Sequence, residues 1–454
     1  MLDRYIEYYK NVLYRTQDHL GYFNNLDEKE LENCILEVLE LVSEEDSIDD
    51  IRAILSSRSN IKKEFLKLFR DKKIASCASI SYGTKNYFET MSYGYIKEVE
   101  QDVKRNFIPK YKKIGEKDIF DLFSISSLFT YLSILILAEK GVISLSDGIG
   151  KYLKVSDEIK DVSISSLLTF RTSFETIKPI ELANNKEELW YLLKNSIPTS
   201  NFSNSEINFL FLKLVIEKAT GISYQEFIKE VFSDKFKLLD TSCSVDPYNV
   251  RLVNTNFDSY YFNDGTLVTN TCYNEGKTHD RLAHFFSNNS NYPTGSSGVF
   301  STHQDMRKLI SLILNGKLVK NSTLFQNSID YNKVYSCFEP YFSGNSIHIF
   351  DDKGAILQID PTMKSYFLLT ANPTHNRVRY LGSAIRHLIK EDTKGKKTIV
   401  LPNGVEKIVT DSFLEDTKNL MHLVSKLLFQ YTILEDVLIK ELDSKKKKSK
   451  KISL

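Results

Sequence analysis

The 454-residue sequence predicts an α+β fold, in which strands from both ends of the main domain form an antiparallel sheet around an inserted helical lobe. Segment 73–96, KIASCASISYGTKNYFETMSYGYI, predicts two strands around a turn at Gly83–Asn86. Helical periodicity then dominates from Ser124 to about Phe232. Strand patterns return at 334–342, 346–350, 354–360 and 364–372, and 378–391 predicts a helix.

The composition is that of a soluble globular protein, with 42% hydrophobic and 26% charged residues. A net charge of +1 gives no overall attraction for nucleic acid or a membrane surface. The N-terminus has no signal-peptide pattern, and no run of about 18 apolar residues predicts a membrane span. The five cysteines are scattered, which favours reduced thiols in a cytoplasm over disulfides or a metal site.

Two extensions flank the main domain, which we assign to 73–393. Residues 1–72 predict a helical extension, in which Ser47 and Asp50 have the spacing of a helix N-cap. Residues 394–443 predict a hairpin and an amphipathic helix that begins at Ser412 and Glu415, and its single apolar stripe must pack on something. Residues 444–454 form a Lys-rich tail, typical of a solvated, disordered terminus.

A serine-rich turn opens the helical region at 120–141, FDLFSISSLFTYLSILILAEKG. A serine at the start of a buried helix is a common way to present a nucleophile, and it normally needs a basic partner one turn later. Here that position holds Ser127. The segment therefore has the form of a nucleophile site without its usual base.

Several segments in order resemble the serine β-lactamase and penicillin-binding-protein superfamily, in particular the class C-like serine hydrolases, over about 73–393. They are LFSISSLFTYLSILILAEKGVISLSDGIGKYL, VSISSLLTFRTSF, FSNSEINFLFLKLVIEKATGISYQEFI, KTHDRLAHFF, PTGSSGVFSTHQDMRKLI and GAILQIDPTMKSYFLLTANPTH. The resemblance implies an acyl-transfer site, built from a serine, a lysine three residues later, a Tyr-x-Asn motif and a third motif on the inner strand. It also implies an oxyanion hole made by backbone N–H groups of the serine and of that strand, and no cofactor.

Carried over residue by residue, the resemblance makes Ser124 the nucleophile, while Ser127 stands at the lysine position and Phe202 at the tyrosine position. Asn204 is retained. A neutral hydroxyl at 127 cannot accept the proton of Ser124 as a lysine would.

The third motif and one helical motif also depart from the pattern. The expected histidine of the strand falls on Ile349, and because strand side chains alternate, we expect the neighbouring His348 to face the other way. Phe170 and Ser173 replace a usual histidine and glycine.

Other groups could complete the site. His279 and His348 are the best substitute bases for Ser124, although a structural role for each imidazole is favoured, and Gly354 is a further pocket candidate. Ser59 and Lys62 have the serine–lysine spacing, but they lie in the N-terminal helical region without partner motifs.

The sequence therefore predicts a cytoplasmic, catalytically impaired homologue that binds a small molecule or protein partner. Two alternatives stay open. One is an active esterase or amidase that uses Ser124 with a non-standard base, and the other is an assembly protein that forms a homodimer through its C-terminal helix.

Overall fold

The structure is a computed structural model of the chain. It describes residues 26–45, 47–102, 104, 107–199, 206–246, 249–255, 258–261, 267–269, 278–280, 282–283, 286, 292–320, 342–343, 346–360, 364–380, 386–401, 404–410 and 412–452. Phe202 and Asn204, and the predicted strand at 334–342 except its last residue, lie outside these residues.

The described chain begins with a run of helices. Their bounds are α2 Glu28–Glu44, α3 Ile48–Arg58, α4 Ile61–Leu66 and the π-helical turn η2 Lys67–Lys72. The Ser47 hydroxyl accepts a hydrogen bond from the Asp50 N–H at the start of α3, which confirms the predicted cap.

The main sheet has seven strands in the order β10-β11-β12-β13-β1-β2-β3. Their bounds are β1 Cys77–Thr84, β2 Phe88–Gln101, β3 Phe107–Lys113, β10 Phe342–Ser343, β11 Ser346–Asp351, β12 Ala355–Asp360 and β13 Ser365–Ala371. Every pairing is antiparallel, and β1 lies beside β13 with Ile80 opposite Leu369. The sheet is therefore built from both ends of the main domain, as the sequence predicts.

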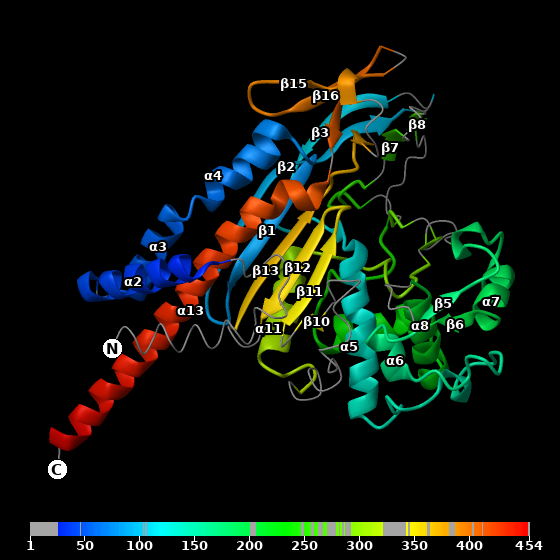
Figure 1. Ribbon diagram of the computed structural model, residues 1–454, viewed down its shortest axis with the longest axis horizontal. Coiled ribbons are helices and arrows are strands. Elements are labelled where there is room, and N and C mark those ends of the chain that lie inside the picture. Colours follow the sequence, from blue (N-terminus) through cyan, green and yellow to red (C-terminus); the bar gives the residue numbers. More distant parts are fainter. Residues whose placement is uncertain are drawn as a thin grey trace.

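Helices between β3 and β10 form a lobe on one side of the sheet (Figure 1). The lobe contains α5 Ser126–Glu139, α6 Ile164–Leu168, α7 Lys186–Lys194, α8 Glu206–Thr220, α9 Tyr224–Ile228, the π-helical η6 Lys229–Lys235, the short 3₁₀ turns η3 Phe123–Ile125, η4 Ile149–Lys151 and η5 Ile180–Leu182, and the small pair β5 Ser173–Glu175 and β6 Ile197–Thr199. Two further strands, β4 Phe120–Asp121 and β9 Phe300–Ser301, pair with each other next to the start of α5. Helix α11 His303–Leu314 packs on β1 and β12.

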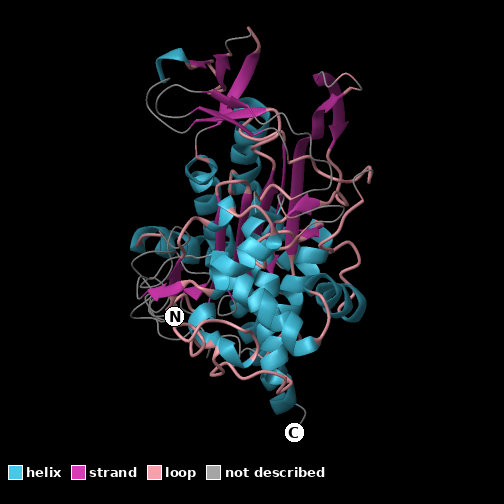
Figure 2. Cartoon of the chain, turned by 90° about the vertical axis from the view of Figure 1, so that its right-hand side faces the viewer, coloured by secondary structure: helices cyan, strands magenta, loops and turns pink. Residues whose placement is uncertain are grey.

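A second sheet of six strands lies at the top of both views, away from the lobe helices (Figures 1 and 2). Its order is β15-β16-β17-β14-β7-β8, with bounds β7 Asp258–Tyr261, β8 Leu267–Thr269, β14 Arg377–Tyr380, β15 Lys390–Glu391, β16 Lys397–Val400 and β17 Glu406–Thr410. The hairpin β16–β17 is as predicted. The helix predicted at 378–391 is wrong at its start, because β14 pairs in parallel with β7 and β17, and only the turn η7 Arg386–Leu388 is helical among the described residues there.

The last element is the long helix α13 Phe413–Ile452, whose first turn is capped by Ser412. It packs against α2, α3, α4, β1 and β13, so its apolar stripe is covered within the chain. The helix continues through most of the Lys-rich tail, which the sequence predicts to be disordered; lysine is a good helix former, and the tail extends a helix already fixed by packing.

Two hydrophobic cores lie on opposite faces of the main sheet. Strand side chains alternate between them, so Leu357 packs with α5 and α8 of the lobe while Ile356 packs with α2, α4 and α13. No helix among the described residues is long and apolar enough to span a membrane.

Candidate active site

Ser124 lies in the short turn η3 that leads into α5, between the lobe and the end of β11. The residue before it, Phe123, is buried and has φ +47°, a left-handed conformation that is unusual for a bulky side chain. The buried carboxylate of Asp121 accepts hydrogen bonds from the N–H groups of Phe123 (3.0 Å) and His279 (2.8 Å). These bonds hold the strained turn and leave Ser124 half-buried at the surface of a cleft.

The two donors of Ser124 both point to one carboxylate. Its hydroxyl donates to Oδ2 of Asp351 at 2.5 Å, and its backbone N–H donates to the same oxygen at 3.1 Å. Oδ1 of Asp351 accepts from the Lys353 N–H at 2.9 Å, so the carboxylate is fixed at the β11–β12 turn. The resemblance to the serine β-lactamases implies that this backbone N–H is a donor of the oxyanion hole. Here the Asp351 carboxylate of the same chain accepts its hydrogen bond.

Ser127, at the expected lysine position, faces away from the cleft. It is 1% exposed, and its hydroxyl donates to the Ser124 carbonyl at 2.6 Å. Its surroundings are apolar and leave a gap of only about 10 Å³. The lining residues are Leu128, Tyr131, Leu168, Phe209, Ile347 and Ile349. This side of Ser124 therefore has neither a base nor the space for a lysine side chain.

Strand β11 places His348 on the far face of the sheet from Ser124. Ile349 packs in the lobe-side core, whereas the His348 ring lies 5.9 Å from that of Phe350, which packs with the opposite core. The β11–β12 register runs without a bulge, so nothing corrects the one-residue offset, in agreement with the sequence prediction. Burial lowers the pKa of His348 to about 3.

The remaining site residues predicted from the sequence, where the structure describes them, all have defined surroundings. The His279 ring packs edge-on against Phe123 at 5.9 Å, one residue from Ser124. Gly354 has φ +116° in the β11–β12 turn, where a Cβ atom would lie 2.5 Å from the Ala371 carbonyl oxygen. Phe170 packs on Phe209 in the lobe core, and the Ser173 hydroxyl bonds that of Thr199.

The cleft in front of Ser124 has a volume of about 340 Å³ and is mainly acidic. Its lining comprises Phe123, Ser124, Glu181, Glu206, Asp280, Ser296, Ser297, Asp351 and Lys353. Burial and the nearby Asp280 carboxylate raise the pKa of Glu206 to about 7, although hydroxyl donors and Lys353 oppose the shift. Among the described residues no group of acidic, histidine or cysteine side chains is arranged to hold a metal ion.

The sequence reasoning missed Asp351, Glu206 and Asp280. A signal existed for Asp351, since it lies two residues after Ile349 and therefore on the same, lobe-side face of β11. Glu206 and Asp280 come from separate segments that only the tertiary fold brings together.

A turn-borne serine at the start of a buried helix, set between an α+β sheet and a helical lobe, is the arrangement of a serine acyl-transfer fold. A family model described as Beta-lactamase matches residues 99–331, slightly more than half of the chain, and the chain belongs to this family.

Known proteins agree on the fold. Penicillin-binding protein 4* of Bacillus subtilis (strain 168) is 25% identical over 184 residues, which are 38% of this chain and 38% of that protein. The solved structure of EstCE1, described as a hydrolase with promiscuous acyltransferase activity, has a TM-score of 0.56 at 13% identity and covers 84% of this chain and 100% of its own. An octameric penicillin-binding protein homologue from Pyrococcus abyssi has a TM-score of 0.52 at 15% identity, covering 69% and 73%. At such identities the structural likeness shows the fold alone.

Proposed function

We propose that this protein is a catalytically impaired member of the β-lactamase family that acts by binding a ligand or partner in the cleft around Ser124. The observation that carries the proposal is the Asp351 carboxylate, which accepts both the N–H and the O–H of Ser124. A carbonyl under attack would need that N–H for its developing negative charge. An anion already bound there both blocks the donor and repels the charge.

The missing base supports the same conclusion. Ser127 offers a hydroxyl that is already donated to the Ser124 carbonyl, in a site too small for an ammonium group. Members of a catalytic unit act together, so losing one typically costs several powers of ten in rate. The cleft is lined by four acidic side chains and one lysine, and this acidic balance also disfavours anionic substrates such as penicillin, which carries a carboxylate of its own.

Adduct formation tests this proposal. The purified protein is incubated with a fluorescent penicillin or a fluorophosphonate, and intact mass is measured alongside Ser124→Ala and Ser146→Ala, an exposed serine outside the cleft. We expect no stoichiometric adduct in any of the three. An adduct on wild type and Ser146→Ala that disappears in Ser124→Ala would refute impairment.

An active serine hydrolase is the second candidate, and one contact favours it. The Ser124 hydroxyl already donates to Asp351 at 2.5 Å, so a carboxylate stands where a base could act, and Glu206, with a pKa of about 7, shares the cleft. Carboxylates are far weaker bases than the amine they would replace, which is why we rank this candidate second. It requires hydrolysis of activated esters by wild type that is lost in Ser124→Ala.

We further propose that the protein works in the cytoplasm and that the extensions at 1–72 and 394–443, beside the domain at 73–393, provide partner surfaces. Three described cysteines, Cys34, Cys77 and Cys243, are buried free thiols, which is consistent with a reducing compartment. Fractionation of the source cells with an antibody to the chain tests the location; recovery outside the cytoplasm would contradict it.

A further inference from the structure

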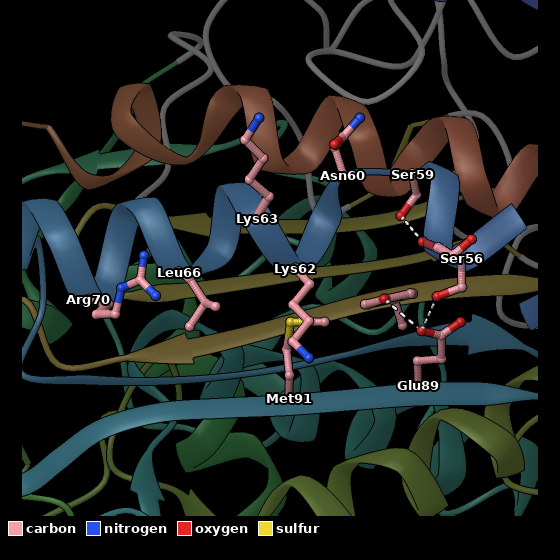
Figure 3. Close-up of a pocket in the computed structure, with 11 residues that line it drawn as sticks. Ser56, Ser59, Asn60, Lys62, Lys63, Leu66, Arg70, Glu89 and Met91 are labelled. Carbon is pink, nitrogen blue, oxygen red and sulfur yellow. Dashed lines mark hydrogen bonds between the residues drawn. The ribbon is translucent and has the colours of Figure 1, made fainter. Parts of the chain in front are cut away.

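A second pocket lies between helices α3 and α4 and strand β2, on the face of the main sheet opposite to Ser124 (Figure 3). Its volume is about 500 Å³, within the range typical of small-molecule sites. The lining residues are Ser56, Ser57, Ser59, Asn60, Lys62, Lys63, Leu66, Arg70, Tyr82, Glu89 and Met91. None of them belongs to the cleft around Ser124.

Lys62 supplies the positive charge of the pocket. Figure 3 shows its side chain pointing from α4 towards Met91 on β2, whereas Lys63 and Asn60 point away from that strand. Lys62 forms no ion pair with any carboxylate in the described part of the chain. Arg70 contributes a second cation at one end, although Asp71 holds it through two bonds, of 2.8 and 3.0 Å.

The acidic group of the pocket is already satisfied by hydroxyls. Oε2 of Glu89 accepts from Ser56 at 2.7 Å and Tyr82 at 3.0 Å, and Oε1 accepts from Tyr431 at 2.5 Å and Tyr87 at 3.4 Å. Four donors fill the acceptor positions of one carboxylate. These four hydroxyl donors therefore hold Glu89 without a cation. The Lys62 ammonium group can bind an anion from solution.

The middle of the pocket is apolar. Leu66 and Met91 are both half-buried and face it between Arg70 and Glu89 (Figure 3). A ligand that fits has an anionic group for Lys62 and a short hydrocarbon portion for Leu66 and Met91. We propose that this pocket binds a small amphipathic anion, a phosphate or carboxylate with an aliphatic part.

The pocket is a binding site and not a second reaction centre. Ser59 and Lys62 have the serine–lysine spacing, but the Ser59 hydroxyl donates to the Ser56 carbonyl at 2.7 Å. Lys62 points towards Met91 instead (Figure 3). The two residues therefore do not form the nucleophile and base that their spacing suggests.

Titration of full-length protein with hexyl phosphate and with hexanoate, followed by ligand-detected NMR, tests the proposal. Lys62→Glu is compared with Lys63→Glu, which makes the same change in net charge. Both lysines are exposed and line the pocket, but the Lys63 side chain points away from β2 (Figure 3). We expect saturable binding of at least one probe, weakened about tenfold or more in Lys62→Glu and less than about threefold in Lys63→Glu. Which probe binds more tightly distinguishes a phosphate from a carboxylate ligand.

Three outcomes would overturn the proposal. One is the absence of saturable binding of both probes at millimolar concentration. Another is equal weakening by the two variants, which indicates general attraction to a basic surface. The third is binding of inorganic phosphate as tight as that of hexyl phosphate, which removes the apolar contribution. Unchanged thermal unfolding of both variants controls for loss of fold, and Ser124→Ala, on the other face of the sheet, leaves this binding unchanged.

Discussion

Replacing Asp351 with alanine separates the two candidate functions, because one predicts that Ser124 reacts faster and the other that it reacts more slowly. In the folded protein a substrate carbonyl can use the Ser124 N–H only after Asp351 has released it. A hydrogen bond to a charged acceptor contributes about 1.5–3 kcal/mol, and Asp351 accepts two from Ser124, at 2.5 and 3.1 Å. Losing one of them before attack slows the reaction about 10- to 150-fold.

Asp351→Ala should therefore increase the rate at which a fluorophosphonate labels Ser124, by about 10- to 150-fold. The double variant Ser124→Ala/Asp351→Ala gives the background rate, and thermal unfolding corrects for loss of the Lys353 N–H bond to Asp351. A slower rate in Asp351→Ala would mean that the carboxylate is the base of an active hydrolase. An unchanged rate would show that Asp351 does not control Ser124 at all.

Four further changes test the site and the fold. Ser127→Lys places a charged chain in an apolar gap of about 10 Å³, so we expect a loss of about 3 kcal/mol or more in chemical denaturation and no gain in Ser124 labelling; a labelled, fully stable variant would contradict the reasoning. Because burial and Asp280 raise the pKa of Glu206 from 4.5 to about 7, its favourable contribution to stability is complete below pH 4.5 and is lost as the pH rises through 7. The unfolding free energy of wild type relative to Glu206→Gln should then fall by up to about 3 kcal/mol between pH 4.5 and 8, and a difference independent of pH would refute the assignment. Arg377→Met leaves Glu98, whose side chain is only 13% exposed, without its ion-pair partner, with an expected cost of about 3 kcal/mol in urea denaturation that Arg377→Met/Glu98→Gln partly restores; equal losses in the single and double variants would show that the pair itself is unimportant. Deleting 412–454 exposes the core shared by α13, α2 and α4, so circular dichroism and light scattering should report unfolded or aggregated chains, whereas a folded species of lower oligomeric order would favour the homodimer alternative.

The elements that agree best with the sequence predictions are those that depend on patterns of neighbouring residues. Strands β1 and β2 show β-propensity around a turn, and Ser47 caps α3 through a bond three residues away. The orientation of His348 followed from strand alternation alone. Residues 378–391 have a helical sequence pattern, but strand β14 forms at their start because it pairs with β7 and β17, which are distant in sequence. An ion pair between Arg377 and Glu98 holds this strand in place.

The candidate site was predictable only in part for the same reason. Motif order placed Ser124 and Ser127, but the contact that matters most joins residues 124 and 351. Periodicity assigns Asp351 to a face of β11, yet it cannot give the distance from that strand end to the turn before α5. Acidic groups from three further segments, Glu181, Glu206 and Asp280, likewise meet only in the folded cleft.

The pairing of β1 with β13 has a consequence for how the chain folds during synthesis. The central strand β1 ends at Thr84, but its partner on one side begins at Ser365, and helix α13, which covers one of its faces, begins at Phe413. Most of the polypeptide must leave the ribosome before that strand has both neighbours and its cover. Contacts of such large sequence separation slow folding. The helical lobe, whose contacts are nearer in sequence, can form first, and closure of the sheet becomes the late step.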